Sequence, residues 1–355
     1  MGVYIIAEAG VNHNGSMKLA KQLIDIAAEA GADAVKFQTF KADELVSQTA
    51  PKAEYQKNTT EEKESQYEML KKLELTEEDH SELIHYCLDK RIQFLSTPFD
   101  LDSVDLLVSF SLPFIKVSSG DLTNAPLLLK IARTGCKVIL STGMSSLNEI
   151  GKALEVMAFG YLDPSTDPSQ HNFEVAFASR KGQNILKEKV TLLHCTTEYP
   201  APFSEVNLKA MDTLKETFGL SVGFSDHTSG ITVPIAAAAR GAAVLEKHFT
   251  VDRGLPGPDH KASLEPDELT NMVKAIRDAE LALGTHTKEM TPSEIKNAPI
   301  ARKSLVARKK IKRGECFSIE NLTVKRPGTG LSPREYWNLL GSKAKKNYEK
   351  DEVIR

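Results

Sequence analysis

The chain has 355 residues, of which 41% are hydrophobic and 26% are charged, a composition that is ordinary for a globular protein and excludes disorder throughout. Its 45 basic and 48 acidic side chains give a formal net charge of −3, which excludes a globally basic nucleic-acid binder. The total hides an asymmetry, because residues 301–355 carry a net charge of +9 and residues 1–300 a net charge of −12. An acidic body is therefore followed by a basic C-terminal segment.

We expect neither a membrane span nor an export signal. No stretch approaches the roughly 20 apolar residues that cross a bilayer, and the first residues enter a strand-like run with no basic segment before it. The cysteines Cys87, Cys136, Cys195 and Cys316 are far apart and form no C-x-x-C pair, which favours reduced thiols over disulfides. The sequence therefore predicts a cytoplasmic protein.

Short apolar runs rich in β-branched residues recur along the acidic body, and a helical pattern of about ten residues or more follows each of them. The predicted strands are Tyr4–Ala9, Ala34–Thr39, Gln93–Thr97, Phe114–Ser118, Lys137–Ser141, Thr191–Thr196, Leu220–Ser225 and Ala243–Phe249. Such alternation predicts a parallel sheet covered by helices, and eight units within residues 1–285 predict a closed (β/α)₈ TIM barrel. A doubly wound open sheet is the alternative.

Polar residues gather where the predicted strands end. They are Glu8, Lys36, Gln38, Thr97, Lys116, Ser119, Ser141, Tyr199, Ser225, His227, Glu246 and His248. A single polar residue at a strand end is usually a cap or a loop anchor. Because the active site of a barrel lies at the carboxyl ends of its strands, we expect this set to converge on one mouth.

Two segments exceed the usual loop length. Residues 41–75 follow a strand, so they lie on the expected catalytic face, where they form either a lid or a solvated loop. Residues 158–189, rich in Pro, Ser and Asp, precede a strand and are expected on the opposite face. His171 in this second segment is therefore a poor ligand candidate.

The helical periodicity lapses after Gly284, which predicts a linker over residues 286–300. Residues 301–355 contain short strand-like pieces and glycine turns, so we expect a small β-rich domain there. The basic run Arg308–Arg313 is typical of a solvated face. RNA binding is an alternative for it, although few aromatic residues accompany the charges.

His227 and His248 end adjacent predicted strands, 21 residues apart, so both imidazoles can reach one point above the mouth. Two neutral imidazoles suit a divalent transition metal that leaves further positions for water or substrate. Glu8 could add a carboxylate or act on substrate. Two structural histidines are the alternative interpretation.

Lys36 and Lys116 interrupt apolar strands, and a buried ammonium needs an anionic partner. Together with the hydroxyls of Ser119, Ser141 and Ser225 they predict a site for a phosphate and a carboxylate. A Schiff-base lysine is the alternative chemistry.

These motifs closely resemble the sialic acid synthase family, whose members condense phosphoenolpyruvate with an amino sugar. The resemblance rests on residues 6–15 (IAEAGVNHNG), 35–38 (VKFQ), 96–99 (STPF), 116–121 (KVSSGD), 140–144 (LSTGM), 224–228 (FSDHT) and 246–250 (EKHFT). Residues 302–305 and 324–328 look like the family's C-terminal SAF domain, which is similar to type III antifreeze proteins. The resemblance implies a TIM barrel followed by an antifreeze-like domain.

The resemblance also implies roles for residues. Phosphoenolpyruvate would be held by Lys36, Lys116, Ser119, Ser141 and Ser225, and the amino sugar by Glu8, Gln38, Asp121, Tyr199 and Asp259, with Thr97 and Thr197 as further substrate contacts. His227 and His248 would bind a divalent metal, commonly manganese, with magnesium or cobalt as alternatives. Arg326 would reach the sugar from the other subunit of a homodimer with swapped C-terminal domains.

The segment from Cys195 to Phe203 looks more like the N,N′-diacetyllegionaminic acid synthase branch, because bacterial N-acetylneuraminate synthases have Asn where Thr197 stands. We therefore expect 2,4-diacetamido-2,4,6-trideoxymannose as the sugar and N,N′-diacetyllegionaminic acid as the product. The alternatives are N-acetylneuraminate synthesis from N-acetylmannosamine, a Schiff-base aldolase, and a non-catalytic glycan or RNA binder.

Overall fold

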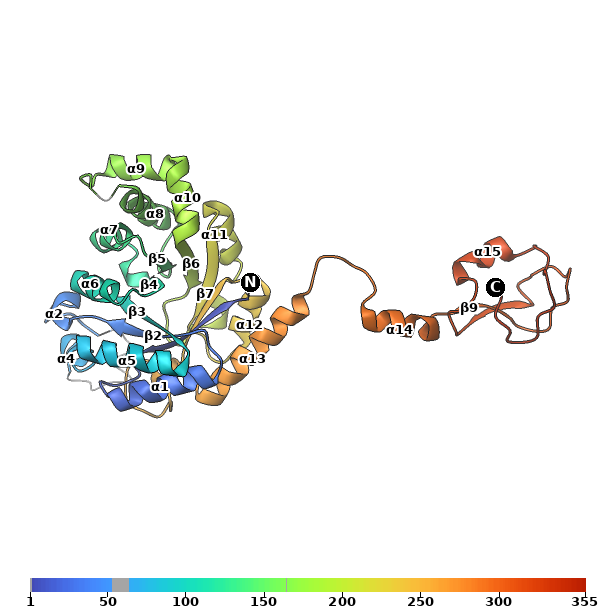
Figure 1. Cartoon of the computed structure of the whole chain (residues 1–355), viewed down its shortest axis with the longest axis horizontal. Helices are drawn as coiled ribbons and strands as arrows, with labels where there is room; N and C mark the ends of the chain where they lie inside the picture. The colour runs from blue at the N-terminus through green and yellow to red at the C-terminus, as the bar shows by residue number, and fades with distance from the viewer. Residues whose placement is uncertain (1, 53–63, 164) are drawn as a thin grey trace. The chain divides into compact units, whose positions relative to one another are not determined.

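A computed structural model describes residues 2–52, 64–163 and 165–355. The chain divides into two compact units, Met1–Gly284 and Thr285–Arg355 (Figure 1). The first unit is an eight-stranded parallel barrel covered by helices, as the sequence predicts. Its strands follow the order β3-β2-β1-β8-β7-β6-β5-β4, and β3 and β4 pack together to close the sheet.

All eight predicted strands are present, each shifted by at most two residues at an end. They are β1 (Tyr4–Gly10), β2 (Ala34–Thr39), β3 (Gln93–Pro98), β4 (Phe114–Val117), β5 (Lys137–Ser141), β6 (Val190–Cys195), β7 (Ser221–Asp226) and β8 (Val244–His248). Their pairing is parallel throughout, which requires a crossover connection after each strand.

Helices supply these crossovers, and most of them pack their apolar faces on the barrel, whereas α2 (Ala42–Leu45) and α4 (Gln66–Lys71) contribute to a smaller apolar cluster around Met69. The others are α1 (Met17–Glu29), α5 (Glu77–Lys90), α6 (Leu101–Ser109), α7 (Ala125–Arg133), α8 (Leu147–Leu162), α11 (Ala210–Phe218), α12 (Thr232–Ala239) and α13 (Pro266–Leu283). Side-chain caps fix where several of them begin; Thr76 and Ser146 form capping boxes at α5 and α8. Among the described residues, none of the helices combines the length and apolar character that a bilayer span requires.

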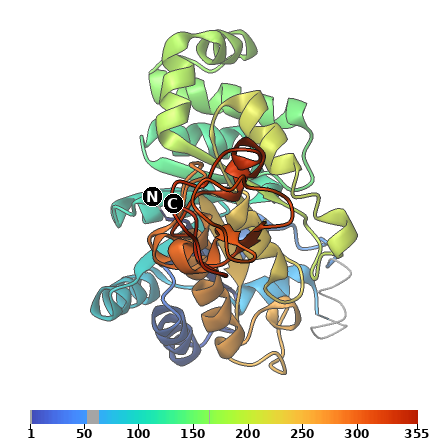
Figure 2. The ribbon, with the colours of Figure 1, turned by 90° about the vertical axis from the view of Figure 1, so that its right-hand side faces the viewer.

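Residues 158–189 differ from the loop-like segment that the sequence indicates. Helix α8 continues to Leu162, and two further helices, α9 (Gln170–Ala178) and α10 (Arg180–Lys189), pack beside it on one side of the barrel (Figures 1 and 2). Ser169 and Ser179 cap the two helices, and each accepts a hydrogen bond from a first-turn amide. The proline-rich composition therefore marks only the connection between α8 and α9.

The floor of the barrel is an apolar layer in which nearly every strand contributes one inward side chain. It contains Ile6, Ala34, Leu95, Ile139, Leu193 and Val244, with Tyr4 and Phe114 packed against them. Strand side chains alternate between faces, so the inward position two residues later on each strand lies one level closer to the mouth.

The second unit has its own small core, built around Leu305, Phe317 and Tyr348. Strands β9 (Ser304–Ala307) and β10 (Leu322–Lys325) form an antiparallel pair, and α15 (Tyr336–Leu339) is a single turn. Part of the expected linker is the helix α14 (Pro292–Ala301), which is tied to this unit because the amide of Gly328 donates to the carbonyl of Pro299 at 2.7 Å.

Candidate active site

A polar layer lies directly above the apolar floor of the barrel. Two residues beyond the floor position, the eight strands carry Glu8, Lys36, Thr97, Lys116, Ser141, Cys195, Ser225 and Glu246 in chain order. The strand register places neighbours side by side; Glu8 pairs with both Lys36 and His248, and Ser225 pairs with Glu246. The alternation that buries the floor therefore also brings these polar groups together.

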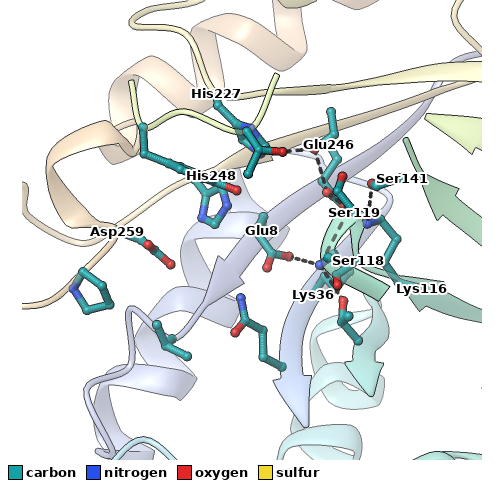
Figure 3. Close-up of a pocket in the computed structure, with 18 of the residues that line it drawn as sticks. Glu8, Lys36, Lys116, Ser118, Ser119, Ser141, His227, Glu246, His248 and Asp259 are labelled. Carbon is teal, nitrogen blue, oxygen red and sulfur yellow. Dashed lines mark hydrogen bonds and ion pairs between the residues drawn. The ribbon is translucent and has the colours of Figure 1, made fainter. Parts of the chain in front are cut away.

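The polar layer forms the base of a pocket of about 240 Å³ (Figure 3). The predicted site residues that line it are Glu8, Lys36, Gln38, Thr97, Lys116, Ser119, Ser141, Thr197, Tyr199, Ser225, His227, His248 and Asp259. They come from every strand of the barrel or the loop that follows it. The expectation that strand-end residues converge is therefore matched by the geometry.

Lys36 and Lys116 share one carboxylate. The ammonium of Lys36 lies 2.7 Å from Glu8 Oε2 and 3.6 Å from Glu246 Oε2, and it donates to Thr97 Oγ1 at 2.9 Å. The ammonium of Lys116 lies 3.6 Å from Glu246 Oε1 and donates to Ser141 Oγ at 2.7 Å. Glu246 therefore bridges the two cations (Figure 3).

Glu246 received no role from the sequence, although it stands at a strand end. Its importance depends on Lys116, which is distant in the chain and becomes its neighbour only in the closed barrel. Ser225 fixes its orientation by donating a hydrogen bond to Oε1 at 2.8 Å. The position of Glu246 at a strand end was the signal that could have identified it, but the sequence interpretation assigned a role at this strand end to His248 instead.

The two buried carboxyl groups have opposite pKa shifts. Burial raises the pKa of Glu8 to about 7; Lys36 opposes the rise, and the charge of Glu246 adds to it. Burial would also raise the pKa of Glu246, but the Lys116 and Lys36 ammonium groups outweigh it and hold the pKa at about 2. Glu246 is therefore ionised at neutral pH, whereas Glu8 can exchange a proton.

The pKa values of the two lysines also shift in opposite directions. Burial lowers the pKa of Lys116, against the effect of Glu246. For Lys36 the carboxylates of Glu246 and Glu8 outweigh burial and raise the pKa. Lys36 is the firmly charged member of the pair.

His227 and His248 meet the requirements for metal ligands. Their ring centroids are 5.7 Å apart. His227 Nδ1 donates to the carbonyl of Thr196 at 2.6 Å, which leaves a lone pair on Nε2, and His248 Nδ1 is buried without a hydrogen-bond partner in the structure. Burial lowers the pKa of His227, and burial reinforced by His227 lowers the pKa of His248 well below its usual value. Both rings are therefore neutral and suited to a divalent transition ion.

The described ranges contain no cluster of three or more His, Cys, Asp and Glu side chains arranged to hold a metal. Two imidazoles would therefore need water or substrate oxygens to complete the coordination of an ion. Such open positions are typical of catalytic rather than structural metal sites.

One wall of the pocket is packed around Gly143. Its amide donates to Ser119 Oγ at 2.9 Å, and Ser119 Oγ lies 3.1 Å from Cys195 Sγ. A Cβ at this position would lie 2.4 Å from Thr197 Oγ1 and 2.9 Å from Ser119 Oγ, closer than real Cβ contacts allow. Only glycine lets these side chains reach the pocket together.

Apolar residues that the sequence interpretation omitted close the pocket on another side. Met69, Leu70 and Leu73 belong to or follow α4, and Phe99 and Val11 lie beside them. The described part of residues 41–75 therefore contributes to the wall of the site. The remainder of the proposed lid, residues 53–63, lies outside the described residues.

Asp121 and Arg326 are the two remaining predicted site residues. The carboxylate of Asp121 accepts hydrogen bonds from Ser118 Oγ at 2.8 Å and from Asn124 Nδ2 at 3.1 Å, so it organises the loop after β4. Arg326 lies in the second unit, where its Nε donates to the carbonyl of Ala301 at 3.0 Å. Their contacts with substrate stay predictions.

Comparisons with known proteins identify the family of the chain. Residues 23–288 match the NeuB family and residues 302–355 match the SAF domain. The chain is 54% identical over 351 residues to the N,N′-diacetyllegionaminic acid synthase of Campylobacter jejuni, covering 99% of this chain and 98% of that protein. It is 47% identical to the enzyme of the same name from Legionella pneumophila, with coverage of 98% and 92%.

A solved structure supports the same assignment. The crystal structure of the N-acetylneuraminic acid synthetase from Leptospira borgpetersenii in complex with citrate superposes with a TM-score of 0.67 at 32% identity. The alignment covers 84% of this chain and 90% of that one. On sequence, fold and site together, the chain belongs to the NeuB family and carries a C-terminal SAF domain.

Proposed function

We propose that the protein is an enzyme that condenses phosphoenolpyruvate with 2,4-diacetamido-2,4,6-trideoxymannose to give N,N′-diacetyllegionaminic acid and phosphate. The observation that carries the proposal is the pair Lys36 and Lys116, buried at one level of the barrel around Glu246 and flanked by hydroxyls. The identity to two N,N′-diacetyllegionaminic acid synthases supports the choice of sugar.

The lysine pair suits an anion that carries both a carboxylate and a phosphate. Lys36 and Lys116 would neutralise these groups, and the hydroxyls of Ser119, Ser141 and Ser225 would donate hydrogen bonds to them. Charges that are fixed before substrate arrives stabilise the transition state without reorganisation. The enol carbon C3 of phosphoenolpyruvate can then attack the aldehyde carbon of the open-chain sugar and form the new C–C bond.

Glu8 is placed to handle the proton of the second step. A water molecule adds to C2, Glu8 accepts its proton, and the tetrahedral intermediate expels phosphate by cleavage of the C2–O bond. A pKa near 7 makes Glu8 an effective base at neutral pH. Water labelled with ¹⁸O should therefore place its label in the C2 oxygen of the product; label in the released phosphate would contradict C–O cleavage.

His227 and His248 would hold the divalent metal, for which manganese is our first choice and magnesium or cobalt the alternatives. When bound, the ion would supply Lewis acidity to the aldehyde oxygen of the sugar. Tyr199 lies against both rings, with centroid distances of 4.2 and 5.6 Å.

The experiment that tests the proposed function is a phosphate-release assay with manganese and phosphoenolpyruvate. It compares 2,4-diacetamido-2,4,6-trideoxymannose with N-acetylmannosamine as acceptors. We expect a kcat/KM at least about tenfold higher for the diacetamido sugar, since a buried polar site rejects an analogue that leaves its groups unpaired. A preference for N-acetylmannosamine would instead identify an N-acetylneuraminate synthase.

A Schiff-base aldolase is a second candidate function, because burial lowers the pKa of Lys116 and thereby favours a nucleophilic amine. Borohydride trapping with the sugar, whose open-chain aldehyde can form an imine with the amine, followed by mass spectrometry tests it. A substrate adduct on Lys116 would replace the condensation mechanism with the aldolase mechanism. We expect no adduct, because the amine is hydrogen-bonded to Ser141 beside Glu246.

We further propose a cytoplasmic homodimer in which the SAF domain of one subunit delivers Arg326 to the other barrel. The opposite charges of residues 1–300 and 301–355 support this arrangement, and the four cysteines are free thiols. Mixing an Arg326→Ala chain with a Lys36→Met chain tests it, since one intact site can form in the mixed dimer. Recovery of activity on mixing is expected, and its absence at a mixed-dimer concentration verified by mass would exclude the swap.

A further inference from the structure

The segment Val11–Gly15 follows β1 and belongs to a prominent motif, yet of its residues only Val11 lines the pocket. Asn12 is 1% exposed and Asn14 lies just outside the site. Both face the long loop between β8 and α13, which carries Pro258 and Asp259 into the pocket wall. The two asparagines therefore contact the loop that supplies a site residue.

Asn12 holds the two ends of this loop together. Its Nδ2 donates to the carbonyl of Phe249 at 2.8 Å and to Ser263 Oγ at 3.0 Å. Ser263 Oγ in turn donates to the main-chain carbonyl of Asp259 at 2.7 Å. The buried side-chain amide of Asn12 thus connects the loop after β1 to the backbone of Asp259 through the hydroxyl of Ser263.

Asn14 holds the middle of the loop. Its Nδ2 donates to the carbonyl of Pro256 at 2.8 Å, and its Oδ1 faces His260 Nε2 at 3.2 Å. Since Oδ1 can only accept, His260 must carry its proton on Nε2, which leaves Nδ1 to accept from Thr250 Oγ1 at 2.7 Å. The neutral ring that this assignment uses is favoured by burial, which lowers the pKa of His260 to about 4.

At Gly257 the loop packs closely against Asn14 and His260. This glycine has φ +147°, and a Cβ there would lie 2.8 Å from Asn14 Oδ1 and 2.7 Å from His260 Cδ2. Asp259 follows two residues later, 8% exposed at the pocket wall (Figure 3). The loop therefore has little freedom between its contact with Asn14 and the carboxyl that it presents.

We propose that Asn12, Asn14 and His260 are positioning residues that fix Asp259 for contact with the amino sugar. None of the three lines the pocket. Their effect on substrate passes through the placement of Asp259, and it rests on the proposed function in that the ligand of Asp259 is the sugar. Figure 3 shows His248 and Glu8 between Asp259 and the two lysines, so we expect phosphoenolpyruvate binding to depend little on this loop.

A double-mutant cycle with Asn14→Ala and Asp259→Ala tests this inference in the full chain. Asn14→Ala should raise the KM for the amino sugar by about tenfold while leaving the KM for phosphoenolpyruvate within about twofold. Because Asn14 acts through Asp259, the double variant should be no worse than Asp259→Ala alone. Multiplicative losses, or an equal rise in both KM values, would overturn the positioning role.

Hydrogen exchange measured by mass spectrometry gives a readout that needs no substrate. In Asn14→Ala, faster amide exchange should be confined to residues 250–265 and to the loop after β1 that contacts them. Exchange that matches the wild-type chain in this loop would overturn the inference even if the enzyme is active. Asn172→Ala on α9 is the matched control, since it removes an asparagine hydrogen bond far from the mouth.

The two readouts separate the inference from the proposed function. If the wild-type chain releases no phosphate with either sugar, the proposed function fails. Faster hydrogen exchange in residues 250–265 of Asn14→Ala would still show that Asn14 holds the loop. If the wild-type chain is active but the losses caused by Asn14→Ala and Asp259→Ala multiply in the double variant, the positioning role alone is refuted.

Discussion

Glu8 and Glu246 face the same ammonium of Lys36 from neighbouring strands, at 2.7 and 3.6 Å, yet their pKa values move in opposite directions. Glu246 lies within 3.6 Å of both ammonium groups, whereas Glu8 is paired with Lys36, feels Lys116 as its smallest effect and lies near the charge of Glu246. One buried layer thus contains a permanent counter-ion and a group able to exchange a proton.

The raised pKa of Glu8 predicts a pH-dependent cost to folding. The pKa of Glu8 is about 7 in the folded chain against 4.5 for a solvated glutamate carboxyl, so its stabilising contribution is present below pH 4.5 and is lost as the pH rises through 7. Glu8→Gln lacks this loss. Its stability relative to wild type should therefore increase by about 2 kcal/mol between about pH 5.5 and pH 8.5, as measured by urea unfolding. A constant difference would contradict the raised pKa.

The same residue should control the pH dependence of turnover. If Glu8 accepts the proton of water, kcat should rise with pH and level off above a midpoint near 7. Glu8→Gln should lower kcat by about 10² to 10⁴ and remove this step. A variant that keeps the wild-type pH profile would assign the proton transfer to another group.

Lys36 should be required both for stability and for binding. Lys36→Met leaves Glu8 and Glu246 buried with less positive charge, which we expect to destabilise the fold by about 3 kcal/mol. The double variant Lys36→Met/Glu8→Gln should recover much of the melting temperature but none of the affinity for phosphoenolpyruvate. Affinity restored together with stability would mean that Lys36 acts only as a structural cation.

Metal removal should abolish the reaction. Dialysis against a chelator should remove activity, and added Mn²⁺ should restore it. His248→Gln should lower the affinity for Mn²⁺, measured by titration calorimetry, by at least about tenfold, whereas His171→Gln on the exposed surface of α9 serves as the control. Full turnover in chelated protein whose metal content is negligible by mass spectrometry would refute the metal assignment.

Gly143 should not tolerate a methyl group. In Gly143→Ala the new Cβ would press on Thr197 and Ser119, so we expect kcat/KM to fall by about 10² with a melting temperature close to wild type. Gly151→Ala on α8 is the matched control, because its Cβ would meet only Phe218 at 3.9 Å. Equal activity of the two variants would show that the wall around Gly143 can relax.

The sequence could predict the barrel because each strand is recognisable from its local pattern of residues. Apolar runs such as residues 138–140 and the helical patterns between such runs identify the units, and parallel crossovers leave few ways to arrange eight of them. Histidines and lysines at strand ends were equally visible. Their convergence follows from the geometry of the barrel rather than from their separation in the chain.

The rest depended on contacts between distant segments. Glu246 acquires its role only beside Lys116, and Met69 reaches the pocket through a segment whose path no local pattern specifies. Helices α9 and α10 were hidden by the proline and serine content before them, although Ser169 and Ser179 are ordinary helix caps. Asp121 accepts hydrogen bonds within its own loop, a contact that the motif did not indicate, and its contact with substrate stays a prediction.

The two stacked layers of the barrel also bear on how new specificities could arise. Folding is supported by floor residues such as Ile6 and Leu193, while chemistry is carried two residues further along the same strands. Substitutions at the upper level change charge and hydrogen bonding without opening cavities below. Changes within the ion-pair cluster around Lys36 remain costly to the fold, so a library aimed at a different acceptor sugar is best restricted to Gln38, Tyr199 and Asp259, which line the pocket outside that cluster.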